Sequence, residues 1–189
     1  MKSYQKLYAA LALTFVFAST LPAQAKDTMS NPMVGGAAMV RTKDIVDNAV
    51  NSQDNTILVA AVKAAGLVDT LKGAGPFTVF APSDEAFKAL PSGTVDTLLK
   101  PANKTTLSSI LTYHVIAGRL DFKALKNLIN SQRGKATLTT VNGAQLTAML
   151  NGPRNIVVVD DKGAVAHIST YDVYQSNGVI HVIDRVLMP

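Results

Sequence analysis

The spacing of apolar residues in the first two-thirds of the chain is mostly helical. Counted from Ile57, apolar residues recur at i, i+1, i+4, i+5 and i+8, which predicts an amphipathic helix. Residues 107–111 and 125–129 carry apolar residues at the same helical spacing, and Asp121 stands where the second of these segments needs an N-cap. We therefore expect helices to dominate this part of the chain.

One stretch, from Phe77 to Pro91, changes from strand to helix at its midpoint. Its first four residues are aromatic or β-branched, which is typical of a strand buried on at least one face. Pro82 ends the strand, because proline lacks the N–H that a sheet ladder needs. Ser83 then stands at the N-cap of a short helix, whose acidic first turn suits the helix dipole and which Pro91 stops.

From Lys135 onward the apolar residues alternate, which is the period of strands. Asn142-Gly143 lies between two alternating segments and predicts a tight hairpin there. Other strands are predicted at residues 113–116, 156–159, 165–168 and 179–187. Helices followed by strands indicate an α+β domain, and the absence of an internal repeat indicates a single copy of it.

Residues 1–25 have the arrangement of a secretory signal peptide. Two lysines precede an apolar run from Leu7 to Leu21, and residues 23–25 have the small-x-small form of a cleavage site. The run is too short for a comfortable membrane span. We expect a mature chain that begins at Lys26, is secreted or periplasmic, and has no stable membrane span after cleavage.

Residues 26–43 show no sustained period and contain glycine, proline and three methionines. We therefore predict a flexible leader over residues 26–43 and a folded domain over residues 44–189. Met29, Met33 and Met39 are soft metal ligands by type, but their irregular spacing favours a mobile leader over a metal site.

The charge and the cysteine content limit the classes of partner and the kinds of stabilisation that we expect. The net charge of +5 falls to +3 when the two lysines of residues 1–25 are removed. No cluster of Lys and Arg interleaves with aromatic residues, so we expect no nucleic-acid partner. The chain has no cysteine, so we expect neither disulfides nor a lipoprotein anchor, and stability must come from the core.

The residues with reactive side chains do not form a catalytic or metal-binding pattern. His114, His167 and His181 show neither an H-x-H pair nor i, i+4 spacing, so no metal site and no cofactor are expected. Ser83, Asp84 and His114 are the residue types of a hydrolytic triad, but a hydroxyl committed to a helix cap is a poor nucleophile. We predict no catalytic residue and a protein that is not an enzyme.

Three segments of the chain resemble the fasciclin (FAS1) domain family, in the family's order. Residues 77–91, FTVFAPSDEAFKALP, resemble its first signature box, residues 111–115 its Tyr-His motif, and residues 177–184 its second box. The resemblance covers roughly residues 44–189. It implies a fasciclin-like α+β fold: a folded antiparallel β-sheet (a wedge or sandwich) with helices packed along one side and the first-box strand paired near the second box.

The resemblance also implies candidate partner-binding residues. In animal fasciclin proteins the Tyr-His region and an Asp-Ile pair shortly before the second box are implicated in integrin binding. The corresponding residues here are Tyr113-His114 and Asp172-Val173. Because a strand places Tyr113 and His114 on opposite faces, we expect at least one of them to be buried. We predict a structural role for His114 and direct contact by exposed loop residues around Asp172.

The resemblance implies adhesion as the function, without catalysis. We expect a protein or glycan partner on a matrix, envelope or cell surface, bound through a face of the sheet and its hairpin loops. The alternative is a carrier of an apolar small molecule, because some algal fasciclin proteins bind carotenoids. An apolar wedge between helices and sheet is where such a carotenoid- or lipid-like ligand would lie. Colour or bound lipid in the purified protein distinguishes the two functions.

Overall fold

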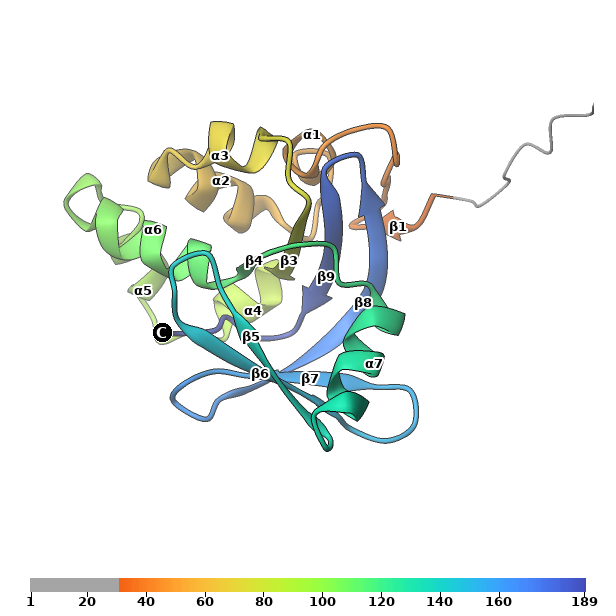
Figure 1. Ribbon diagram of the computed structural model, residues 1–189. Coiled ribbons are helices and arrows are strands. Elements are labelled where there is room, and N and C mark those ends of the chain that lie inside the picture. Colours follow the sequence, from red (N-terminus) through yellow and green to blue (C-terminus); the bar gives the residue numbers. More distant parts are fainter. Residues whose placement is uncertain (1–30) are drawn as a thin grey trace, which may run out of the picture. The chain divides into compact units, whose positions relative to one another are not determined.

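A curled sheet of seven strands forms the centre of residues 31–189, the part of the chain that the computed structural model describes (Figure 1). The strands are β3 (Phe77–Pro82), β4 (Val115–Ala117), β5 (Lys135–Thr139), β6 (Gln145–Leu150), β7 (Ile156–Val159), β8 (Val165–Gln175) and β9 (Gly178–Ile183). Their order across the sheet is β4-β3-β9-β8-β7-β6-β5. All neighbours are antiparallel except β3 and β9, which are parallel. The predicted α+β class is therefore confirmed, and the predicted antiparallel sheet is wrong only for this pair of strands. The pairing of β3 with β9 also confirms the prediction that the strand of the first signature box lies near the second box.

The two edges of the sheet approach each other because β8 bends. The register of β8 against β9 shifts twice between Ile168 and Val173, as expected of bulges that kink a strand. Ile116 of β4 and Thr140, which follows β5, then form an isolated antiparallel bridge. The sequence pattern had ended this strand at Ile168, because the alternation of apolar residues breaks where the bulges begin.

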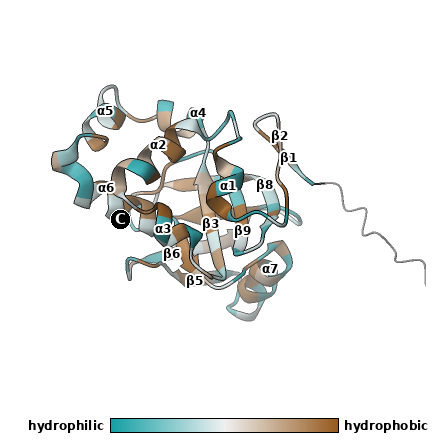
Figure 2. Ribbon diagram, turned by 90° about the horizontal axis from the view of Figure 1, so that it is seen from above, coloured by the Kyte–Doolittle hydropathy of each residue, from teal (hydrophilic) through white to brown (hydrophobic). Residues whose placement is uncertain are grey.

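Most of the helices gather together, and one lies apart from them (Figure 1). They are α1 (Ile45–Ala49), α2 (Thr56–Ala65), α3 (Val68–Lys72), α4 (Asp84–Lys88), α5 (Thr94–Leu98), the 3-10 helix η1 (Pro101–Asn103), α6 (Lys104–Tyr113) and α7 (Phe122–Ser131). The prediction of helices along one side therefore holds for α1 to α6, whereas α7 packs separately on β5 and β6. Teal and brown residues alternate along α7 in Figure 2, as expected of a helix with one buried face.

The neighbouring strands β3 and β9 separate two hydrophobic cores. Val79 and Ala81 belong to a core shared with α1, α2, α3 and α6, whereas Phe80 belongs to a core that includes Leu125 and Ile129 of α7. Successive side chains of a strand point to opposite faces. A strand that is buried on both faces therefore reads as a continuous apolar run, which is the pattern that begins at Phe77.

Residues 31–43 were predicted to belong to a flexible leader, and this prediction is wrong for them. β1 (Met33–Val34) and β2 (Ala37–Ala38) form a two-stranded hairpin, and Val34 and Met39 are buried in the core beneath α1 to α3. The folded unit therefore includes Asn31 and does not begin at residue 44. The periodicity of apolar residues did not predict that this segment is folded, because its residues are buried by contacts with distant parts of the chain. The predicted signal peptide and Met29 lie outside the described residues.

The predicted strand, corner and capped helix at residues 77–91 are confirmed. Ser83 Oγ accepts a hydrogen bond from Ala86 N at 3.3 Å and so caps α4. The neighbouring Asp84 carboxylate accepts from Ile57 N at 2.9 Å, in the first turn of α2. Ser83 and Asp84 thus hold two helix starts at one corner of the sheet.

Ser83→Ala should lower the free energy of unfolding by about 1 kcal/mol, within the range of roughly 0.5–2 kcal/mol measured for lost N-caps. Urea denaturation of the purified variant measures the change. Ser92→Ala, at an exposed position, is the matched control and should stay within about 0.5 kcal/mol of the wild type. Equal stability of the Ser83→Ala and Ser92→Ala variants would exclude the capping role.

Candidate functional site

Tyr113, the first of the candidate partner-binding residues, ends helix α6 and does not lie in a strand as predicted. The apolar stripe of α6 reaches Tyr113 at i+3 from Ile110, so the helix continues until the chain turns into β4. The ring is fully buried, and its hydroxyl donates to Gln145 O at 2.9 Å and accepts from Asp161 N at 3.1 Å. Tyr113 therefore fastens α6 to the start of β6 and to the turn after β7, which lie at the same end of the sheet.

His114 follows as the C-cap of α6, and both of its ring nitrogens are engaged. Nδ1 lies 2.8 Å from Ile110 O, which can only accept, so Nδ1 carries the proton. Nε2 accepts from the backbone N–H of Leu187 at 3.0 Å. Burial lowers the pKa of His114 to about 4. The neutral imidazole thus connects α6 to the segment after β9.

Acidification should weaken the fold through His114. The pKa of this imidazole is about 4 in the folded chain against 6.5 for the free side chain, so between these values the unfolded state binds more protons. Lowering the pH from 7 to 5 should therefore decrease the free energy of unfolding by about 2 kcal/mol. Burial lowers the pKa of His181 as well, which acts in the same direction. Urea denaturation at several pH values measures the slope.

His167 supplies the matched control, because its side chain is exposed. His167→Gln should keep the pH dependence of the wild type, whereas His114→Gln should flatten it. An unfolding free energy that is the same at pH 7 and pH 5 in the wild type would mean that His114 is not held as a buried neutral ring.

Asp172 lies at the bend of β8, with a left-handed φ of 57°. Its carboxylate accepts from Phe122 N at 2.7 Å, in the first turn of α7, and its backbone N–H donates to His181 Nδ1 at 3.3 Å. Asp121 caps the same helix by accepting from Ala124 N at 2.8 Å, as the sequence predicted. Sequence reasoning missed the role of Asp172, because its partner is 50 residues away.

The structure leaves little of the four candidate residues for a partner to touch. Tyr113, His114 and Val173 have exposed fractions of 0%, 2% and 1%, and Asp172 is half-buried. Among residues 31–189, no hydrogen bond or ring contact joins Tyr113 or His114 to Asp172 or Val173. The two motifs therefore share no polar contact, although His114 and Val173 both line one apolar cavity.

Within residues 31–189, the residues considered for a hydrolytic triad are each engaged in other contacts. Ser83 and Asp84 cap helices, and both ring nitrogens of His114 are bonded to backbone groups. Within the described residues no three His, Asp or Glu side chains are placed to hold a metal ion. Met33 is exposed and Met39 is buried, so these two thioethers do not converge.

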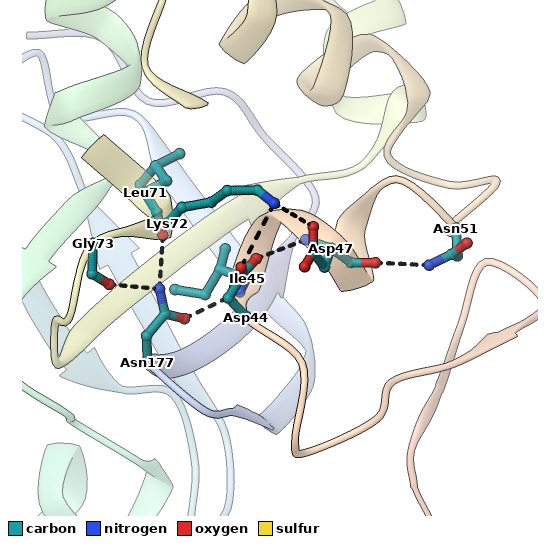
Figure 3. Close-up of polar contacts among 8 residues, drawn as sticks. All are labelled: Asp44, Ile45, Asp47, Asn51, Leu71, Lys72, Gly73 and Asn177. Carbon is teal, nitrogen blue, oxygen red and sulfur yellow. Dashed lines mark hydrogen bonds and ion pairs between the residues drawn. The ribbon is translucent and has the colours of Figure 1, made fainter. Parts of the chain in front are cut away.

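Asn177 connects three separate elements, which sequence reasoning did not find. Its Oδ1 accepts from Ile45 N at 3.1 Å, and its Nδ2 donates to Leu71 O at 2.7 Å and to Gly73 O at 2.9 Å (Figure 3). The side chain is buried, between the turn before β9, the start of α1 and the end of α3. No local pattern reveals such a role, since the partners are more than 100 residues away.

An ion pair lies beside Asn177 at the surface. Lys72 donates to Asp47 at 2.6 Å and lies 3.8 Å from Asp44, which caps α1 (Figure 3). The hydrogen bond from Lys72 lowers the pKa of Asp47. Lys72 with its two aspartates forms the only ion pairs found among residues 31–189.

An apolar cavity of about 80 Å³ lies between α1, α2, α3 and the sheet. Its lining includes Leu58, Val62 and Leu111 from the helices and Ile180 from β9, and Met39 lines it from the N-terminal segment. An apolar cavity of this kind stays dry, and one of about 150 Å³ admits benzene. The volume here suits a smaller apolar molecule.

Exposed side chains on the outer strands and their loops form the surface that is open to a partner. In β5, Lys135, Thr137 and Thr139 are exposed between the buried Ala136 and Leu138. The first half of β8 alternates in the same way. A rigid sheet thus presents one solvated face.

Comparisons with known proteins point to one family. The family model described as the fasciclin domain matches residues 53–189. Protein sll1483 of Synechocystis sp. is 40% identical over 195 residues, which covers 100% of this chain and 99% of that protein. The cell surface glycolipoprotein MPT83 of Mycobacterium tuberculosis is 37% identical over 165 residues, covering 84% of this chain and 67% of that protein. Transforming growth factor-beta-induced protein ig-h3 of Sus scrofa is 37% identical over 134 residues, only 17% of its own length.

The fold also matches a solved structure. A FAS1 domain pair from the insect cell adhesion molecule fasciclin I aligns with a TM-score of 0.69 at 20% sequence identity. The alignment covers 79% of this chain and 52% of that chain, so it supports the fold. A search for candidate membrane-spanning helices within residues 31–189 finds none.

Proposed function

This chain belongs to the fasciclin domain family, and we propose that it is an exported, non-catalytic adhesion domain. Its partner is a protein or glycan of a matrix, envelope or cell surface. The observation that carries the proposal is the similarity to the cell surface glycolipoprotein MPT83, which extends over 84% of this chain. The fold likeness to part of an insect cell adhesion molecule supports the same class of function.

The partner contacts exposed side chains rather than the buried motif residues. Tyr113, His114 and Val173 become accessible only if a core opens, because they have almost no exposed surface. Asp172 keeps some exposed surface at the bend of β8, beside the loops around α7. Contact therefore falls to this region and to the exposed face of β5 and β8.

An attachment assay tests the proposal. Beads coated with the mature protein should be retained by envelope or matrix fractions from the cells that produce it, and beads coated with heat-unfolded protein should not. Equal retention of both kinds of bead would refute adhesion by the folded domain.

Export predicts a defined N-terminus. The signal-like pattern of residues 1–25 leads us to expect an exported protein that starts at Lys26. Intact-mass measurement of the exported protein checks this. A mass that includes residues 1–25 would instead support a membrane-anchored protein.

A second function, carriage of an apolar small molecule, is favoured by the cavity beneath α1 to α3. Its volume of about 80 Å³ does not hold a carotenoid unless these helices move away from the sheet. Solvent extraction and mass spectrometry of natively produced protein test this function. A stoichiometric apolar compound would support the carrier, and its absence would count against it.

A further inference from the structure

Positive charge is concentrated in one part of the sequence. Residues 119–154 contain six Lys and Arg residues and one acidic residue, Asp121. The rest of residues 31–189 contains nine basic and eleven acidic residues. The modest net charge of the chain therefore hides a strongly basic segment. Five of its cations lie on α7, in the loops beside it and at the start of β5, and we call them the basic corner: Lys123, Lys126, Arg133, Lys135 and Arg154.

The fold places these five residues at one end of the sheet. Lys126 Nζ donates to Pro153 O at 3.2 Å, which brings the turn containing Arg154 next to α7. Lys135 begins β5 and pairs with Met149 near the end of β6, so the loop before β5 lies at the same end as that turn. Helix α7 stands there alone, away from α1 to α6 (Figure 1).

Within residues 31–189, no ion pair neutralises the basic corner. The ion pairs found within residues 31–189 involve only Lys72. Lys123, Arg133, Lys135 and Arg154 are all exposed. The two carboxylates at the start of α7, those of Asp121 and Asp172, accept hydrogen bonds from backbone N–H groups of the helix. The positive potential of the corner is therefore available to an anionic partner.

The side chains between the cations indicate which anionic partner fits. Exposed amides and hydroxyls lie among them, namely those of Asn127, Asn130, Ser131, Gln132 and Asn151. The large hydrophobic residues that are exposed within residues 31–189 are Met33, Val50, Val141 and Val165. None of these belongs to α7 or its loops.

This composition favours a polysaccharide over a membrane or a nucleic acid. A helix that binds a membrane surface uses apolar anchors, and a site for single-stranded nucleic acid uses exposed aromatic rings. Cations interspersed with amides suit a polymer that carries both anionic groups and hydroxyls. We propose that the basic corner binds an acidic polysaccharide, with Lys and Arg on its carboxylate, sulfate or phosphate groups. This inference rests on the proposed adhesion function and names the class of partner.

Binding to defined polymers tests the inference. The mature protein should bind dextran sulfate and polygalacturonate in 50 mM salt, and should not bind neutral dextran. Raising the salt to 200 mM should weaken binding about 10- to 100-fold, because each of several charge contacts releases about one counterion. Isothermal titration calorimetry with each polymer measures the affinity in 50 mM salt and the fold-change in 200 mM salt.

A charge-matched pair of variants locates the site. The corner variant combines Lys123→Gln, Arg133→Gln, Lys135→Gln and Arg154→Gln, and should bind at least about 10-fold more weakly. The control variant removes four exposed cations elsewhere, through Lys88→Gln, Lys100→Gln, Lys162→Gln and Arg185→Gln. It should keep wild-type affinity within about 3-fold, because the cations that it removes lie outside the corner.

Several outcomes would overturn the inference. One is equal weakening in both variants, which would mean that net charge alone attracts the polymer. Another is tighter binding of the wild type to anionic lipid vesicles or to single-stranded DNA than to either acidic polysaccharide. Failure of the wild type to bind either acidic polymer in 50 mM salt is a third. Attachment of beads coated with the corner variant separates the two proposals: full attachment refutes the basic corner and leaves adhesion standing.

Discussion

Asn177→Ala should lower the free energy of unfolding by about 3–5 kcal/mol. The buried amide bonds to Ile45 N, Leu71 O and Gly73 O, and alanine leaves all three backbone groups without this partner. An unsatisfied buried polar group costs about 1–3 kcal/mol. The turn before β9 would also lose its connection to α1 and α3. Urea denaturation followed by circular dichroism measures the effect.

Asn51→Ala is the matched control for this prediction. Asn51 also donates its amide to a backbone carbonyl, Asp47 O at 2.7 Å, but at an exposed position where water replaces the bond (Figure 3). We expect a change within about 0.5 kcal/mol. If Asn177→Ala were as stable as Asn51→Ala, the three bonds of Asn177 would not be what holds the helices to the turn.

His114→Ala should lower the free energy of unfolding by about 2–4 kcal/mol. The change removes a buried ring, leaves a cavity, and deprives Ile110 O and Leu187 N of their partner. A residue that only contacted a partner from the surface would change stability by no more than about 0.5 kcal/mol. Melting curves and bead attachment, both corrected for the folded fraction, distinguish these roles.

Asp172 is the residue to compare with His114. Asp172→Ala should cost about 1 kcal/mol through the lost contact to Phe122 N and should reduce attachment. Asp172→Asn keeps an acceptor for Phe122 N but removes the negative charge. It therefore distinguishes the effect of the helix cap from the effect of the charge. A stable His114→Ala that no longer attaches, beside a fully adherent Asp172→Ala, would show that the two roles are reversed.

The parts of the fold that were predicted correctly are those whose signals are local. Pro82 and Ser83 mark the strand end and the helix start, and Asn142-Gly143 marks the hairpin between β5 and β6, all from neighbouring residues. Proline, cap and turn preferences act over a few residues, so a single sequence reveals them. Residues 33–39 do contain a local turn signal, Gly35-Gly36, but the strands beside it are only two residues long and show no alternation. Their burial comes from contacts with the core.

The candidate site was harder to predict, because it depends on contacts between distant segments. Next to the apolar Val115 and Ile116, the residues Tyr113 and His114 have the pattern of a strand. In the structure, however, the apolar stripe of α6 continues, so the helix extends two residues further and ends at Tyr113. Asp172 looked like an exposed loop residue, whereas it caps a helix far away in the sequence. The sequence predicted that at least one of Tyr113 and His114 is buried, and both are.

Because β3 pairs in parallel with β9, the sheet joins residues 77–82 to residues 178–183, about a hundred positions later in the chain. A chain that emerges N-terminus first can close neither core before β9 appears, since both cores include side chains of that strand. Contacts of such long range also make folding slow. If the chain is exported, as we propose, neither core can close until nearly all of the polypeptide has passed through the translocation channel.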